Sequence, residues 1–204
     1  MTAHRLPVFI SIEGNIGAGK TTLAKILAKE LNGSLLLEKF EENPHLEKFY
    51  KNPKLHALPV ELWFLLERHK QMISFFKNNK RKIIISDYNI SKCLVFAKAN
   101  LNNKEFHVYK KYFEIINPNL QKPELVIYLR QAIARLKENI RKRGRNYEGK
   151  ISSEYLNKIQ KGYGNYLKQT GEKEAMILDC SIFDLSKKRD IQSLISDLKH
   201  TISC

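Results

Sequence analysis

The sequence predicts an α/β protein in which a five-stranded parallel sheet is flanked by helices on both faces. Short apolar runs alternate with longer segments of helical periodicity, the pattern of strand–helix–strand crossovers. A glycine-rich loop directly follows the first run. The length of 204 residues is enough for one α/β domain with a sizeable core. We therefore expect residues 1–204 to form a single domain.

Five apolar runs have the length of buried strands. They are residues 8–12, 35–37, 83–85, 125–129 and 176–178. Because parallel strands end at one edge of a sheet, ligand-binding residues are expected just after these runs.

The intervening segments carry apolar residues at helical spacing. Helices are predicted in residues 23–31, 58–76, 106–116, 132–143 and 153–167. Asn117-Pro118-Asn119 predicts a turn. The pattern is least informative in residues 150–204.

The charge balance favours acidic partners. Lys and Arg number 36 against 21 Asp and Glu, a net charge of +15. Nucleic acid, an anionic membrane or a polyphosphate nucleotide would each be attracted. No apolar run approaches the roughly 20 residues of a membrane span, and the three cysteines form no C-x-x-C pair. We expect a cytoplasmic protein without a membrane segment.

The glycine-rich loop matches the phosphate-binding pattern G-x-x-x-x-G-K-[ST] between a strand and an amphipathic helix. The motif consists of Gly14, Asn15, Ile16, Gly17, Ala18, Gly19, Lys20 and Thr21, and Thr22 follows it. Backbone N–H groups of such a loop converge on phosphate oxygens, and the lysine bridges the β- and γ-phosphates. We expect these residues to bind ATP, with Thr21 as a ligand of Mg²⁺.

A dense cationic cluster follows the fourth strand and its helix. Arg141, Lys142, Arg143 and Arg145 surround Gly144. Arginines on a mobile segment can close over ATP and neutralise charge on a phosphoryl group in transfer. We predict a short arginine-rich lid at about residues 141–150, although a solvated helix end is the alternative interpretation.

Two carboxylates are candidates for contact with an acceptor. Glu38 follows the second strand, where it can accept the proton of an acceptor hydroxyl. Glu61 and Arg68 are seven residues apart, so they share one helix face about 10 Å apart along the axis. That face can read the edge of a base, or it can be a polar surface stripe.

Five blocks of sequence resemble the deoxyribonucleoside kinases, and bacterial deoxyadenosine/deoxyguanosine kinases most of all. They are IEGNIGAGKTTLAKILA at 12–28, LEKFEENPHLEKFYKNP at 37–53, PVELWFLLERHKQ at 59–71, SDYNISKCLVFAKANL at 86–101 and RKRGRNYEG at 141–149. The resemblance implies a P-loop kinase fold, a homodimer, and transfer of the γ-phosphoryl group of ATP to the 5′-hydroxyl of a deoxyribonucleoside.

The resemblance also implies residue roles. Glu38 falls where the family has the carboxylate that activates the 5′-hydroxyl. Asp87 is expected to position Mg²⁺ or that hydroxyl, so either carboxylate can be the base. With Lys20 and Arg143, they form the expected catalytic set.

The nucleoside-binding residues follow in the same way. Tyr50 and Glu148 match the pair that holds the sugar 3′-hydroxyl, Phe96 matches an aromatic that stacks on the base, and Arg68 matches a base-pocket arginine. Glu61 stands where many members carry Gln. A carboxylate only accepts hydrogen bonds when ionised, which suits the adjacent donors of guanine, although protonated Glu61 can also read adenine. A purine is therefore the expected base.

The sequence departs from the family at several positions. Ser86-Asp87-Tyr88 lacks the arginine of the family's block, and Lys92 stands where an aspartate often contributes to the base pocket. The pocket tryptophan falls on Asn43. The first lid arginine counts to Asn139, for which Arg141 can substitute.

Two rival functions remain open on the sequence. A thymidylate-kinase-like nucleoside monophosphate kinase shares the loop and the arginines, but Glu38 would repel its phosphorylated acceptor. A nucleic-acid-binding P-loop module would use the +15 charge on phosphates. The carboxylates expected in the pocket disfavour this function, so nucleic acid is an unlikely partner.

Overall fold

The computed structural model describes residues 8–170 and 175–203. Its five strands form one parallel sheet in the order β2-β3-β1-β4-β5. The strands are β1 Val8–Gly14, β2 Ser34–Leu36, β3 Ile83–Ser86, β4 Leu125–Arg130 and β5 Ala175–Asp179. Each matches a predicted run, so the predicted sheet is confirmed.

The described residues also form eight α-helices and three 3₁₀ turns. The helices are α1 Lys20–Glu30, α2 Leu46–Lys51, α3 Pro53–Asn78, α4 Lys92–Asn100, α5 Asn103–Ile116, α6 Ile133–Arg143, α7 Ser153–Thr170 and α8 Lys188–Ser203. The 3₁₀ turns are η1 Phe40–Glu42, η2 Asn117–Asn119 and η3 Asn146–Lys150. The sequence pattern did not predict α2, α4 or α8.

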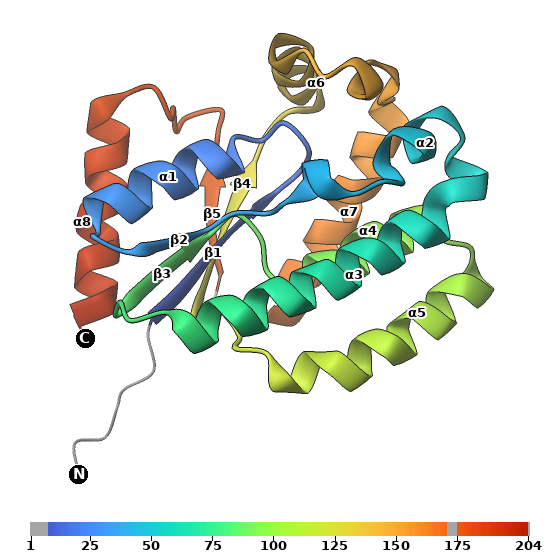
Figure 1. Cartoon of the computed structure of the whole chain (residues 1–204). Helices are drawn as coiled ribbons and strands as arrows, with labels where there is room; N and C mark the ends of the chain where they lie inside the picture. Colours follow the sequence, from blue (N-terminus) through green and yellow to red (C-terminus); the bar gives the residue numbers. More distant parts are fainter. Residues whose placement is uncertain (1–7, 171–174, 204) are drawn as a thin grey trace.

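Helices cover both faces of the sheet. Helices α1 and α8 lie on one side, and α3, α4, α5 and α7 lie on the other (Figure 1). Alternating side chains of β1 supply both layers: Ile10 and Ile12 pack towards α1 and α8, whereas Phe9 packs with Ile84 towards α3 and α5. This two-sided burial is the reason why most strand residues are apolar.

The carboxyl ends of the parallel strands bring distant segments to one edge. The phosphate loop follows β1, the segment with Glu38 follows β2, and Asp87 follows β3 directly. Helix α6 and turn η3 lie beyond this edge (Figure 1). Among the helices described, none is long and apolar enough to cross a lipid bilayer.

Candidate active site

The phosphate loop has the backbone that its glycines permit. Gly14, Gly17 and Gly19 have φ values of +155°, +82° and +96°. A Cβ added to Gly17 would lie 2.9 Å from the carbonyl oxygen of Leu136, because the loop packs against α6. Both the torsion and the close approach therefore require glycine at this position.

Lys20 lies at the start of α1 and points back over the loop. Its Nζ donates to the carbonyl oxygens of Gly14, at 3.0 Å, and Asn15, at 2.9 Å. Burial lowers the pKa of Lys20 to about 8, and the charge of Lys92 adds to this effect. The side chain of Asn15 donates through Nδ2 to the carbonyl of Leu156 at 2.8 Å and accepts at Oδ1 from the backbone N–H of Ile16 at 2.9 Å.

A hollow of about 770 Å³ opens beside the loop. Residues 17–22 line one side, and residues 180–187 after β5 line another. The second stretch contains Phe183 and Asp184. Asn139, at the position of the first lid arginine, donates to the carbonyl of Gly17 at 2.8 Å and so supports the loop.

Asp87 joins three segments at the carboxyl edge. Its Oδ2 accepts from Thr21 Oγ1 at 2.5 Å, and its Oδ1 accepts from the backbone N–H of Glu38 at 2.8 Å. A hydroxyl and a carboxylate oxygen are ligands that Mg²⁺ prefers. In the described part of the chain, no three or more His, Cys, Asp or Glu side chains lie together so that they could hold a metal ion.

Glu38 is held by two buried cations. Arg68 donates to Oε1 through Nε at 2.7 Å and also through Nη2, and Lys92 Nζ donates to Oε2 at 2.6 Å. Burial alone would raise the pKa of the Glu38 carboxyl, but Arg68 and Lys92 together lower it to about 2. Both carboxylate oxygens therefore carry a charge-assisted hydrogen bond.

The acceptor pocket lies between one face of α3 and one face of α4. Its cavity has a volume of about 130 Å³. Helix α3 contributes Glu61, Phe64 and Arg68, and α4 contributes Lys92, Phe96 and Asn100. Glu61 and Arg68 are both buried, so the alternative of a polar surface stripe is wrong.

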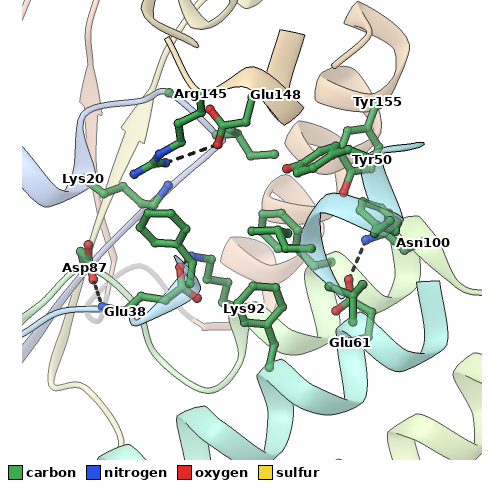
Figure 2. A pocket seen from close by; sticks show the side chains of 18 of the residues that line it. Lys20, Glu38, Tyr50, Glu61, Asp87, Lys92, Asn100, Arg145, Glu148 and Tyr155 are labelled. Atoms are coloured by element: carbon green, nitrogen blue, oxygen red, sulfur yellow. Dashed lines mark hydrogen bonds and ion pairs between the residues drawn. The ribbon is translucent and has the colours of Figure 1, made fainter. Parts of the chain in front are cut away.

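Glu61 lies at the far side of this pocket from the phosphate loop. Its Oε1 accepts from Asn100 Nδ2 at 2.6 Å (Figure 2). Its Oε2 is buried and has no hydrogen-bond partner among the described residues. Burial raises the pKa of Glu61 to about 7, although Asn100 and Arg68 act in the opposite direction.

The residues expected at the sugar line the same pocket. Tyr50 stacks on Tyr147 with ring centroids 5.8 Å apart. The pKa of Tyr50 is raised, mainly by burial and also by the negative charge of the neighbouring Glu148. Glu148 is buried and accepts from Arg143 Nη2 at 2.5 Å and from Arg145 Nη1 at 3.3 Å. Arg145 and Glu148 lie together at one side of the pocket in Figure 2.

The arginines of segment 141–150 divide into two groups. Arg143 and Arg145 line both the acceptor pocket and the hollow beside the phosphate loop. Arg141 is exposed and lines a separate hollow formed by α6 and residues 144–151. The structure therefore does not bring Arg141 to the phosphate loop, and a lid made of all three arginines stays a prediction.

Three residues with polar groups that line the pocket were missing from the predicted site. Lys92, noted only as a departure from the family, and Asn100 share one face of α4 with Phe96, because the three are spaced by four residues. That spacing is visible in the sequence. Tyr155 also lines the pocket, from α7, but no local pattern indicates its approach from so distant a segment.

The phosphate loop, the parallel sheet and a buried pocket at the carboxyl edge define a P-loop phosphotransferase with a small acceptor. The family model for deoxynucleoside kinases matches residues 10–203. This chain therefore belongs to the deoxynucleoside kinase family and is an ATP-dependent deoxynucleoside kinase.

Individual relatives agree with this family. The chain is 35% identical to the deoxyguanosine kinase of Bacillus subtilis, covering 95% of this chain and 97% of that protein. It is 26% identical to the deoxyadenosine/deoxycytidine kinase of the same organism, covering 99% and 97%. A solved deoxyadenosine kinase of M. mycoides with dCMP and dCDP superposes with a TM-score of 0.83 at 28% identity, covering 95% and 100%. The match favours a kinase of nucleosides over both rival functions.

Proposed function

We propose that this kinase prefers purine deoxynucleosides and that Glu61 reads the base. The observation that carries the proposal is the buried Glu61 Oε2, which has no partner among the described residues. A buried carboxylate oxygen without a partner is costly, so a ligand that donates to it gains binding energy. Guanine offers two adjacent donors, N1–H and the exocyclic amine. The name of the B. subtilis deoxyguanosine kinase supports the same preference.

The rest of the nucleoside would occupy the pocket between α3 and α4. Phe96 stacks on the base, and Arg68 borders it while holding Glu38. Tyr50 and Glu148 hold the 3′-hydroxyl and crowd C2′, which disfavours ribonucleosides. All these side chains line the acceptor pocket.

ATP would lie in the hollow beside the phosphate loop. The loop amides and Lys20 bind its phosphates, and Arg143 and Arg145 approach from segment 141–150. Thr21 and Asp87 provide oxygen ligands suited to Mg²⁺. When bound, the ion would neutralise charge on the phosphates.

Glu38 is the proposed base, with Asp87 as the alternative. The 5′ oxygen attacks the γ-phosphorus in line with the bond to ADP, and the carboxylate takes the hydroxyl proton. Arg143 offsets charge on the phosphoryl group in transfer. A pKa of about 2 makes Glu38 a weak base while both cations hold it, but catalysis of this reaction depends mainly on positioning and electrostatics.

The test is a panel of four deoxynucleosides and four ribonucleosides with ATP, measured as kcat/KM. We expect the purine deoxynucleosides to rank first. Glu61→Gln should change the order of the bases, because its amide both donates and accepts. A pyrimidine at the head of the panel would refute the purine preference. An unchanged order in the variant would show that Glu61 does not read the base.

We also propose that the kinase is a homodimer formed through α3 and α5. These helices expose the apolar side chains Leu55, Leu66, Ile73, Val108, Tyr112 and Ile115. Sedimentation analysis should give twice the chain mass, and Leu66→Glu should shift the species towards the monomer. A monomeric wild type would contradict this proposal. The single domain over residues 1–204 and the cytoplasmic location stay predictions.

A further inference from the structure

Lys92 is a buried cation in the acceptor pocket. It lies at the first turn of α4, before the apolar residues Cys93, Leu94 and Val95. Its Nζ lies 2.6 Å from Glu38 Oε2 and 5.6 Å from the centroid of the Phe96 ring. A buried ammonium group is costly to desolvate, so Lys92 is retained here at a cost that its pairing with Glu38 only partly offsets.

The segment before α4 supplies no cation to the site. Tyr88 is fully buried, and its hydroxyl donates to Gln71 Oε1 at 2.5 Å. Asn89 Nδ2 donates to Ser11 Oγ at 3.1 Å. Both side chains are thus engaged in the interior of the molecule. Lys92 therefore contributes a positive charge that residues 86–89 lack.

Lys92 and the phosphate loop line one common pocket. The acceptor pocket that Lys92 lines also includes Lys20 and Thr21 of the phosphate loop. The charge of Lys92 lowers the pKa of Lys20, after burial, which is consistent with their proximity. Lys92 thus pairs with the proposed base in a pocket that Lys20, the proposed ligand of the γ-phosphate, also lines.

We propose that Lys92 is a catalytic residue that contacts the phosphoryl group during its transfer and then holds the 5′-phosphate of the product. This inference deepens the proposed function and rests on it. As the γ-phosphoryl group approaches, Lys92 Nζ breaks its hydrogen bond to Glu38 Oε2 and donates to a phosphoryl oxygen instead. The freed carboxylate oxygen then accepts the proton of the 5′-hydroxyl.

The step balances without a further reactant. The bond between the 5′ oxygen and the γ-phosphorus forms, and the bond from that phosphorus to the bridging oxygen breaks. The electron pair of the broken bond stays on ADP, and the hydroxyl proton goes to Glu38. Lys92 keeps its protons and acts through charge and hydrogen bonding alone.

The test compares two ligands of one pocket, a deoxynucleoside and its 5′-monophosphate, by calorimetry. Lys92→Met should weaken the monophosphate roughly 10- to 100-fold, the range for hydrogen bonds to charged groups. The parent deoxynucleoside, which carries no phosphate, should lose much less affinity. Lys92→Arg should restore much of the difference, because it keeps the charge. Lys98→Met is the matched control, an exposed lysine of the same helix.

An equal effect of Lys92→Met on both ligands would overturn the inference, since a purely structural lysine would weaken both alike. If the single variant does not fold, Lys92→Met is combined with Glu38→Gln and compared with Glu38→Gln alone, where the same selective loss is expected. A wild type that phosphorylates no deoxynucleoside refutes the proposed function as well. An active wild type with no selective loss refutes the role of Lys92 alone.

Discussion

The acceptor pocket and the hollow beside the phosphate loop, where ATP is proposed to bind, share Lys20 and Thr21. They differ in the groups that surround their charged side chains. In the acceptor pocket, charged side chains neutralise one another: Glu38 binds Arg68 and Lys92, and Glu148 binds two arginines. At the phosphate loop, the proposed anion ligands are backbone N–H groups and Lys20, whose ammonium group rests on loop carbonyls.

This difference indicates how the two regions should respond to mutation. The acceptor pocket reads its ligand with side chains, so substitutions there should act differently on different acceptors. The loop binds a phosphate chain common to all reactions of the enzyme, so substitutions there should act on every acceptor alike. The predictions below test this contrast, from the largest expected effect to the smallest.

The largest effect is expected from Glu38→Gln. An amide cannot accept a proton from the 5′-hydroxyl, so kcat should fall by roughly 10²- to 10⁴-fold, the usual contribution of a general base. The measurement is single-turnover transfer with saturating ATP and deoxynucleoside. Glu42→Gln, an exposed carboxylate nearby, is the control. If Glu38→Gln kept the wild-type kcat, Glu38 would not be the base, and Asp87 would be the remaining candidate.

Lys20→Ala should reduce kcat by roughly 10²- to 10³-fold, the range for losing one preorganised electrostatic contact. Because Lys20 binds the phosphate chain, the factor should be the same for each deoxynucleoside in the panel. Lys25→Ala on the same helix, where the side chain is exposed, should leave activity unchanged. If the reduction in kcat differed between deoxynucleosides with different bases, the phosphate loop would not act on every acceptor alike, and the proposed difference between the two regions would be wrong.

The sequence predicted the fold because the signals for it are local. The five apolar runs have the composition and length of buried strands, and Gly14 to Thr21 match a motif whose backbone geometry is built in. Helix α4 was missed, since its buried residues are spread around the helix and it lacks the one-sided apolar stripe that identifies a surface helix. Helix α2 has only six residues, too few to show a period.

The site was predictable one residue at a time, but its pairings were not. Glu38, Glu61 and Arg68 were each identified as site candidates, and all three line the acceptor pocket. The ion pairs of Glu38 to Arg68 and Lys92 span 30 and 54 positions of sequence. Such partners depend on how α3 and α4 pack, which no local pattern specifies.

Glu61 should make stability depend on pH. Its folded-state pKa is about 7, above the ordinary value of 4.5. Between these values the unfolded chain releases the proton while the folded chain keeps it, so the free energy of unfolding falls as pH rises. The stabilisation is complete below about pH 4.5 and lost by about pH 7, on the order of 3 kcal/mol.

Urea unfolding of the wild type and of Glu61→Gln at several pH values between 4.5 and 8 measures this effect. The difference in free energy of unfolding between the two should change in favour of the variant as pH rises. Adding a deoxynucleoside that donates to Glu61 should lower its pKa and shift the window to lower pH. A difference that stays constant would mean that Glu61 is already ionised in the folded protein.

The smallest effect should come from Arg141→Ala, and its contrast with Arg143→Ala is the informative part. Arg143 lines both hollows and binds Glu148, so its loss should lower kcat and weaken the acceptor. Arg141 is exposed and lies in a separate hollow, so its removal should change kcat/KM by about twofold or less, in keeping with surface substitutions. Steady-state kinetics with ATP varied would separate the two. A large loss in Arg141→Ala would mean that segment 141–150 turns during the cycle and carries Arg141 to the phosphates, which would restore the predicted three-arginine lid.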